Sequence, residues 1–414
     1  MSSSLTIHQA RLVLPHRVVT GDLVVRDGVI HEIRPKTDAP QGESIDGEGL
    51  VVLPGLVDSY VRLDALDDLG AASGALLAGG ITSAVGVREA STGAELDAEL
   101  QRIATDAALH FGLFVRAGAH VEEALQARRA QGVWVDAELL GSEGVEKVFA
   151  EAPGLVCVDH HDATRLRDRW LLFADSDDPL DVPRAHDVDT CVHATHRALE
   201  LARRHGTRLL LPHVSTAEEV DQLPEEPGRV TAAVQPAHLF HDADAYDRLG
   251  KRAVCRPPLR GRRHRDALWE GLRAGKLMMC SGHWPVGGWA KDGALRDVHP
   301  GWPSAEWWLP LLIDATHDER CTWLDIARWT SERPAQALGL RRKGRLEAGY
   351  DADLVIVDPH AERVVGDSAR IHTVAGWSPW HGKALRGWPT HTIVGGRTAW
   401  RDGTRHPSRG RELS

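Results

Sequence analysis

The chain has 414 residues and a formal charge of −10, with 26% charged and 42% hydrophobic residues. This composition is typical of a folded globular protein and excludes a disordered or fibrous chain. The acidic balance argues against binding to nucleic acid or a membrane surface, because no net positive field attracts phosphates. The length would fit two or three average domains, although α/β barrels routinely exceed that average.

The N-terminal residues lack a basic segment followed by an apolar one, so we expect no secretory signal. No run approaches the length of an uncharged apolar transmembrane helix. The cysteines are scattered, odd in number and without a C-x-x-C pair, which favours free thiols in a reducing compartment. They are Cys157, Cys191, Cys255, Cys280 and Cys321. The expected location is therefore cytoplasmic.

Short alternating runs at the N-terminal end predict β-strands. Residues 5–34 alternate apolar and polar side chains over short stretches. The pairs Gly21-Asp22 and Asp27-Gly28 are both typical of hairpin turns, so they predict two reversals of the chain within this segment.

The C-terminal end shows the same pattern, with short strand-like runs and Gly-rich turns in residues 344–359 and 390–403. The simplest interpretation is one small β-domain built from both termini. The polar, basic end at residues 404–414 is expected to be frayed.

Between these ends, apolar strand-like runs alternate with helical segments or long loops. The eight runs are VVLPGLVD, ITSAVGV, FGLFVRAGA, GVWVDA, GLVCVD, TRLLLPHVS, GRVTAAVQ and KLMMCSG. Alternating β and α units indicate a parallel sheet, and eight of them fit a (β/α)8 barrel. The predicted class is therefore α/β, a TIM-type barrel over residues 53–340 with a composite β-domain from residues 1–52 and 341–414.

Function in such a barrel is expected at the C-terminal ends of the strands. Polar residues that directly follow the predicted strands are therefore the candidates. They are Asp58 to Arg62, Arg88, Glu89, Asp136, Asp159, His160, His161, His213, His238, and Ser281 to His283.

Four segments together resemble the cyclic amidohydrolases, and most closely the dihydroorotases. They are VVLPGLVDSYVRL at the first strand, LPHVSTAEEV after the sixth, CRPPLRGRRHRDALWEGLRAGKLMMCSGHWP ending at the eighth, and TSERPAQALGLRRKGRLEAGYDADLVIVDP beyond it. Their order and spacing extend over nearly the whole chain. The resemblance implies shared descent and fold, but fold alone does not determine function.

The resemblance also implies a demanding chemistry. These enzymes open a cyclic amide with a hydroxide held on one or two divalent metals. The family pattern has a His-x-His pair on the first strand, often a carboxylated Lys on the fourth, one His each on the fifth and sixth, and an Asp on the eighth. The metal lowers the pKa of the water, while the Asp moves the proton.

In this sequence the first and fourth strands depart from that pattern. The His-x-His positions hold Tyr60 and Arg62, and an arginine there would repel a dication. The Lys position falls at Asp136 or Ala137, and Lys147 stands further on, in the following helix.

The later strands depart from it as well. The fifth-strand His position falls at Asp159, or at His160 if the alignment shifts by one residue. His213 keeps the sixth-strand position, whereas Gly282 replaces the Asp that would bind metal and carry the proton. The resemblance therefore implies that the metal centre is lost.

The family's contacts to the substrate carboxylate are an Arg, an Asn and a His, and here those positions hold Asp64, Glu89 and His283. Two carboxylates would then face a carboxylate, each repulsion being worth roughly 4 kcal/mol at ~4 Å and an effective dielectric near 20. Dihydroorotase activity is therefore not expected.

Structural roles compete with functional ones at these positions. We expect Asp58 and Asp159 to pair with Arg62, Arg88 or Arg116 in a salt-bridged plug that fills the old site, in preference to binding metal. Several histidines are interpreted as ordinary hydrogen-bonded or surface residues, namely His160, His161, His238 and His283.

Three functions remain open. The favoured one is a non-catalytic dihydroorotase-like protein, itself a homodimer or larger, that acts as a structural or regulatory partner in pyrimidine biosynthesis. The resemblance implies aspartate carbamoyltransferase as the partner, with no cofactor, nucleic acid or membrane involved. The alternative is a metal-dependent amidohydrolase with a rebuilt mononuclear zinc site that cleaves a different cyclic amide or lactone. Its ligands would come from Asp58, His160 or His161, His213 and His238. The third is a small-molecule sensor that retains the pocket.

Tryptophan is unusually common, with 14 residues against 5 Phe and 3 Tyr. Twelve of them lie between Trp269 and Trp400, and most are expected to pack in the core and at the seam between domains. Trp284 and Trp289 follow the eighth strand. They are expected either to close the vacated mouth of the barrel or to form an exposed anchor for a partner.

Overall fold

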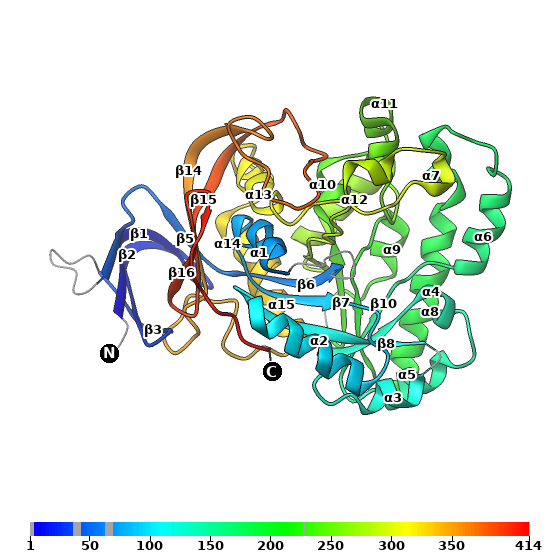
Figure 1. Cartoon of the computed structure of the whole chain (residues 1–414), viewed down its shortest axis with the longest axis horizontal. Coiled ribbons are helices and arrows are strands. Elements are labelled where there is room, and N and C mark those ends of the chain that lie inside the picture. The colour runs from blue at the N-terminus through cyan, green and yellow to red at the C-terminus, as the bar shows by residue number, and fades with distance from the viewer. Residues whose placement is uncertain (1–3, 36–42, 63–68, 119, 227, 414) are drawn as a thin grey trace.

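The computed structural model describes residues 4–35, 43–62, 69–118, 120–226 and 228–413. They form two sheets with helices around one of them, and the nine-stranded sheet lies at one end of the molecule (Figure 1).

One sheet is built from both ends of the chain. Its N-terminal strands are β1 (Ser4–Val13), β2 (Val18–Arg26), β3 (Val29–Arg34), β4 (Glu43–Asp46) and β5 (Val51–Pro54). Its C-terminal strands are β14 (Leu354–Val364), β15 (Ala384–Val394), β16 (Arg397–Arg401) and β17 (Thr404–Arg405). The two halves meet where β5 pairs antiparallel with β14, with Leu53 opposite Val355. The predicted composite β-domain is confirmed; its exact residue boundaries stay a prediction.

One of the two predicted hairpin turns is wrong. Gly21 and Asp22 lie inside β2, and the chain reverses before them. The Asp22 carboxylate is fully buried and accepts a hydrogen bond from the Gln9 backbone N at 3.0 Å, at an irregularity in the neighbouring strand. The second turn is confirmed, with Asp27 and Gly28 at φ values of 50° and 78° between β2 and β3.

The other sheet is an eight-stranded parallel barrel, as predicted. Its strands are β6 (Leu56–Arg62), β7 (Ile81–Val87), β8 (His110–Ala117), β9 (Gly132–Val135), β10 (Leu155–Val158), β11 (Arg208–Leu211), β12 (Val230–Val234) and β13 (Leu277–Met279). The Arg62 backbone N donates to the His283 backbone O at 2.9 Å, which ties the end of the first strand to the segment after the last. The first predicted run is divided between β5 of the terminal sheet and β6 of the barrel.

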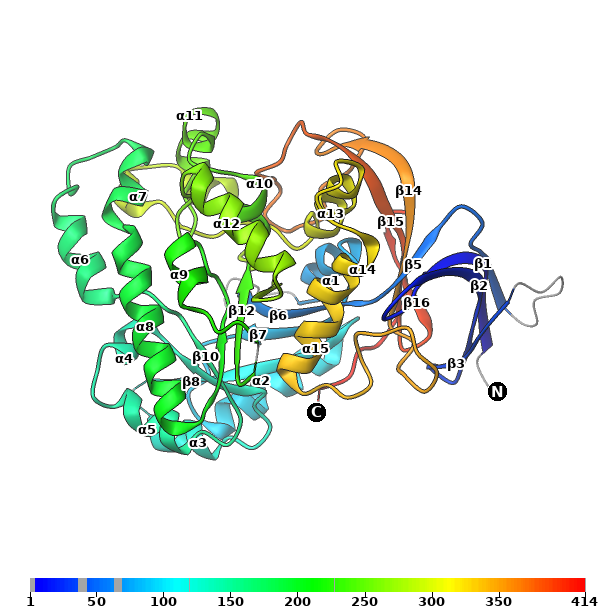
Figure 2. The same ribbon diagram turned by 180° about the vertical axis from the view of Figure 1, so that it is seen from behind.

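Helices surround the barrel strands, cover the N-terminal end of the barrel and contact the terminal sheet (Figures 1 and 2). They are α1 (Leu69–Ala78), α2 (Gly93–Asp106), α3 (Val121–Gln126), α4 (Ala137–Leu140), α5 (Val145–Glu151), α6 (Ala163–Leu171), α7 (Val182–Ala185), α8 (Val188–His205), α9 (Ala217–Gln222), α10 (Pro236–Phe240), α11 (Ala245–Leu249), α12 (Arg262–Arg273), α13 (Trp308–His317), α14 (Trp323–Ala327) and α15 (Arg333–Leu338). Within the described ranges, none of them is long and apolar enough to cross a bilayer.

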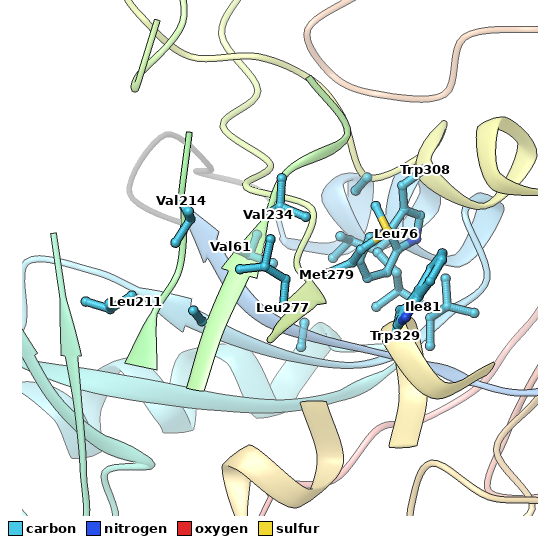
Figure 3. Packing of buried hydrophobic residues seen from close by; sticks show 14 of the residues in the cluster. Val61, Leu76, Ile81, Leu211, Val214, Val234, Leu277, Met279, Trp308 and Trp329 are labelled. Atoms are coloured by element: carbon cyan, nitrogen blue, oxygen red, sulfur yellow. The ribbon is translucent and has the colours of Figure 1, made fainter. Parts of the chain in front are cut away.

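The barrel strands bury side chains on both faces, as parallel strands covered by helices do. On the outer face, Leu277 and Met279 of β13 pack close to Trp308 and Trp329 (Figure 3). A separate apolar cluster draws members from all eight strands and fills the barrel interior. Its largest members are Tyr60, Phe114 and Trp134, so aromatic rings occupy the centre of the barrel.

Most tryptophans pack in the core and at the domain seam, as predicted. Trp269, Trp307, Trp308 and Trp329 are among the largest fully buried side chains. A further apolar cluster joins barrel-side residues to Trp388 of β15, and therefore links the barrel to the terminal sheet.

The C-terminal segment is docked, so the expectation of a frayed end is wrong. The Gly410 backbone N donates to the Ala107 O at 2.9 Å, and the Leu413 N donates to the Phe111 O at 2.8 Å. The Leu413 side chain is only 3% exposed and belongs to the interior cluster, together with Leu338 of α15. The tail and α15 therefore close the N-terminal end of the barrel.

This docking predicts a cost for truncating Leu413. The Leu413→Ala variant is expected to lower the free energy of unfolding by about 2–3 kcal/mol, because it removes buried methyl groups and leaves a cavity. Equilibrium urea unfolding measures the loss. Leu172→Ala, at a residue 74% exposed, is the control and should change stability by less than about 0.5 kcal/mol. Equal stability of both variants would contradict the docked tail.

Candidate functional site

The C-terminal ends of the barrel strands bring several predicted site residues around one small cavity. Its volume is about 20 Å³, room for roughly one water molecule, whereas pockets that bind small molecules usually enclose hundreds of Å³. The residues around it are Tyr60, Arg62, Asp159, His213, Gln235, Cys255, Arg256, Gly282, Trp284, Pro300 and Trp302. We call this place the barrel mouth.

Aromatic side chains and the guanidinium of Arg62 fill much of the mouth. The guanidinium carbon of Arg62 lies 5.2 Å from the centre of the Trp134 ring and 4.3 Å from the centre of the Trp284 ring. Such cation–π contacts reach about 2 kcal/mol when they are desolvated. Tyr60, only 3% exposed, stands edge-on to the His213 ring, with 5.2 Å between the ring centres. Of the two tryptophans in question, Trp284 therefore helps to close the mouth, whereas Trp289 is 80% exposed.

Asp159 binds two histidines. Its Oδ1 lies 3.1 Å from the His213 Nε2 and 3.2 Å from the His161 Nδ1. Burial opposes ionisation of this carboxyl, but the histidines outweigh it and hold its pKa well below the usual range. Burial also lowers the pKa of His213, which favours a neutral ring whose Nε2–H donates to Asp159.

Asp58 links the first and last barrel strands. Its carboxylate accepts hydrogen bonds from the Ser281 backbone N at 3.0 Å and from the Ser281 hydroxyl. Burial raises the pKa of Asp58 to about 6. Asp58 and Asp159 thus bond to serine and histidine, and the predicted plug of aspartate–arginine pairs is wrong.

The arginines proposed for that plug have other partners. Arg88 pairs with Glu99 at 2.8 Å. Arg116 pairs with Asp136 at 2.9 Å and with Glu89. Arg88 and Arg116 are thus paired with carboxylates other than Asp58 and Asp159.

Most of the remaining residues that the resemblance singled out have partners in the protein, and one of them lies outside the described residues. Asp136 caps α4 by accepting from the Leu139 backbone N at 2.8 Å, in addition to its pair with Arg116. Lys147 lies in α5, as predicted, and pairs there with Glu122. Glu89 is bound to Arg116, and Asp64 lies outside the described residues.

Gly282 is closely packed against the side chain of Gln235. Its φ is +57°, a left-handed backbone conformation, and a Cβ built there would stand 2.3 Å from the amide of Gln235. Gln235 follows β12 and takes the space that a side chain at position 282 would need. Any residue other than glycine here must strain the backbone and displace Gln235.

Three of the candidate histidines have partners within the protein. The His160 Nε2 lies 3.2 Å from the Glu219 Oε1, both side chains being fully buried. The His238 Nε2 lies 2.9 Å from the Pro257 carbonyl O. The His283 Nδ1 accepts from two backbone N atoms in the loop after β13, and burial lowers its pKa to about 3, so its ring is neutral.

The donor set does not fit the metal centre that the family implies. In the part of the chain that the structure describes, no three His, Cys, Asp or Glu side chains converge in a way that could hold a metal ion. Asp159, His161 and His213 do meet, but through one shared carboxylate oxygen. The guanidinium of Arg62 lines the same cavity and would repel a dication.

Three residues were not predicted from the sequence: Trp134 and Gln235, which contribute to the mouth, and Glu219, the buried partner of His160. Trp134 stands at an inward position of β9, and Gln235 directly follows β12, so strand alternation and strand ends could have indicated both. Glu219 forms a capping box with Thr216, a spacing visible in the sequence. Its partner His160 comes from a distant loop and leaves no local signal.

Comparisons with known proteins agree with the architecture. The family model described as "Amidohydrolase family" matches residues 51–399. A dihydroorotase from Halobacterium salinarum is 30% identical over 92% of this chain and 96% of that protein. An allantoinase from Rubrobacter xylanophilus is 31% identical over 92% and 91%. The structure of an L-hydantoinase (dihydropyrimidinase) from Arthrobacter aurescens superposes with a TM-score of 0.93 at 22% identity, covering 100% of both chains.

The chain therefore belongs to the amidohydrolase family. Within that family it is a dihydroorotase-like protein of the cyclic amidohydrolase group.

The buried pair of His160 and Glu219 makes a stability prediction. Burial opposes ionisation of Glu219, but the bonds from His160, Ser215 and Thr216 outweigh it and lower its pKa to about 2. Glu219→Gln leaves His160 without its charge partner and is expected to cost about 3 kcal/mol in the free energy of unfolding. The exposed Glu225→Gln is the matched control and should cost less than about 0.5 kcal/mol.

The ionisation of His160 and Glu219 determines how the free energy of unfolding changes with pH. Because the pKa of Glu219 is lowered from 4.5, its contribution is present above pH 4.5 and is lost as the pH falls. Because the pKa of His160 is raised from 6.5, its contribution is present below pH 6.5 and is lost as the pH rises through the folded value. Urea unfolding at several pH values should therefore show the largest gap between wild type and Glu219→Gln from pH 4.5 to 6.5. A gap independent of pH would contradict a charged pair.

Proposed function

We propose that the chain is a non-catalytic dihydroorotase-like protein that serves as a structural or regulatory partner in pyrimidine biosynthesis. The observation that carries the proposal is the filled mouth, where Arg62 lies against Trp134 and Trp284 beside a cavity of about 20 Å³. A cyclic amide needs far more room than one water molecule. A pocket-retaining sensor is disfavoured for the same reason.

The chemistry of the mouth supports loss of hydrolysis. A metal-held hydroxide needs ligands that attract a dication, and Arg62 offers a positive charge where the family has a ligand. Proton transfer needs a titratable group at the end of the eighth strand, and Gly282 has none. Gln235, which occupies the adjacent space, cannot exchange a proton in its place.

A rebuilt mononuclear zinc site is the second candidate, and one observation favours it: Asp159, His161 and His213 lie together. The other proposed ligands have different partners. Asp58 is bonded to Ser281, and His160, in place of His161, would have to leave Glu219. The non-catalytic function therefore has more support.

The first test is hydrolysis of dihydroorotate after incubation with zinc. The expected result is no turnover above the protein-free blank, together with less than one zinc per chain by elemental analysis. An active dihydroorotase assayed in parallel is the control. Zinc-dependent opening of dihydroorotate would contradict the proposal. One tightly bound zinc per chain with hydrolysis of another cyclic amide or lactone would favour the second candidate.

Aspartate carbamoyltransferase is the partner we propose, and Trp289 is the anchor we propose for it. Trp289 follows β13 and is 80% exposed, the most exposed of the large hydrophobic side chains in the described part of the chain. Tryptophan is enriched among the residues that dominate protein–protein binding energy. A cytoplasmic location and a homodimer or larger assembly belong to the same proposal, with which the five free, buried cysteines are consistent.

Coexpression with the aspartate carbamoyltransferase of the same organism tests the partner. The two proteins are expected to elute together in size-exclusion chromatography. Trp289→Ala should weaken the complex about 30-fold, because an aromatic anchor carries about 2 kcal/mol. Leu172→Ala, at a similarly exposed residue of a different segment, is the control and should leave the affinity unchanged. Separate elution of the wild-type proteins would contradict this partner.

A further inference from the structure

A second cavity lies at the end of the barrel opposite the mouth. Its walls come from the beginnings of β10, β11, β12 and β13 and from α15, and its volume is about 280 Å³. Figure 2 shows α15 beside the start of β12. Four cationic side chains line it, namely Arg208, Arg229, Lys276 and Arg333. We call it the basal pocket.

Backbone carbonyls hold the three guanidiniums in place. Arg208 donates to the Ala337 O at 2.7 Å, Arg229 to the Gly206 O at 2.7 Å, and Arg333 to the Leu277 O at 3.1 Å. A carbonyl fixes the orientation of a guanidinium but does not neutralise its charge. Because arginine carries five N–H donors, each of these side chains retains donors for a ligand.

A glycine in the backbone beside the pocket allows the guanidinium of Arg333 to lie close to the chain. Arg333 donates to the Gly275 carbonyl as well, and a Cβ at Gly275 would stand 2.7 Å from the Arg333 Nη2. Gly275 has a φ of +83°, a conformation that favours glycine. The guanidinium therefore lies close against a stretch of chain without a side chain.

The pocket has little negative charge of its own. Among the residues that the structure describes, Glu225 is the one carboxylate within ion-pair distance of the four cations, at 2.7 Å from the Lys276 Nζ. Its side chain is 85% exposed, so it can turn away into solvent. The neighbouring Glu332 is bonded to Arg345 at 2.6 Å. Four cations around one concavity repel one another, and a bound anion relieves that repulsion.

We infer that the basal pocket binds a small phosphate-bearing anion. Guanidinium groups match the oxygens of a phosphate in pairs, and lysine binds phosphate as a point charge. The pocket volume of about 280 Å³ is large enough for a small ligand such as a phosphate ion. The pocket lies away from the strand ends where barrel enzymes carry out chemistry, so the anion would act on stability or regulation. It touches α15, which closes the barrel, and it does not depend on the function proposed for the mouth.

Calorimetric titration with inorganic phosphate, pyrophosphate and uridine monophosphate tests this site on the full chain. The expected result is saturable binding, with pyrophosphate tighter than phosphate. Arg229→Gln and Lys276→Gln should each weaken binding at least tenfold, because each removes a charge-assisted hydrogen bond. Arg128→Gln, at an exposed residue outside the pocket, makes the same change of charge and should bind like wild type.

Thermal unfolding completes the test, because a ligand of the folded state raises the Tm. Phosphate should raise the Tm of wild type more than sodium chloride does at equal ionic strength. Equal shifts from both salts would indicate screening alone and overturn the proposal. Unchanged affinity in both pocket variants would overturn it as well. Tighter binding of the nucleotide than of inorganic phosphate would identify an organic phosphate as the ligand, and the reverse order would identify the free ion.

Discussion

The guanidinium of Arg62 lies against two indole rings at the end of the first barrel strand, and the rest of the mouth depends on this contact. Trp134 comes from the fourth strand and Trp284 from the loop after the eighth, so one cation joins three segments that are distant in sequence. The backbone bond from Arg62 to His283 supports the same closure. A positive charge and aromatic rings thus hold together strand ends that relatives of this fold use to surround a ligand.

Both ends of the barrel are closed, but by different means. At the mouth, polar contacts contribute to the closure, as when Asp159 accepts from His161 and His213. At the other end, Leu338 of α15 and Leu413 of the tail close the interior with apolar contacts. The closure of the mouth is charged and specific, whereas the other is hydrophobic and leaves the cations of the basal pocket facing outward. The two ends can therefore differ in function without sharing residues.

The sequence allowed the architecture to be predicted because strand and helix periods are local properties. All eight barrel strands and the two-part terminal sheet followed from such patterns. The partners of the charged side chains could not be predicted from the sequence, because they depend on which distant segments come together in space. Asp58 was expected to bind an arginine but meets Ser281, and Asp22 was taken for a turn residue although it lies buried inside a strand. The docked tail was missed because its single apolar anchor, Leu413, has no periodic neighbours.

Arg62 and Gly282 are each coupled to neighbouring side chains of the mouth, so a substitution at either position disturbs its surroundings. Placing an acid at Gly282 would strain a left-handed backbone and displace Gln235. Replacing Arg62 by histidine would leave Trp134 and Trp284 without the cation that they contact and would open a void beside them. Each of these substitutions is therefore expected to cost stability. The residues of the mouth therefore constrain one another through packing, and a single change at Arg62 or Gly282 acts on folding as well as on the cavity.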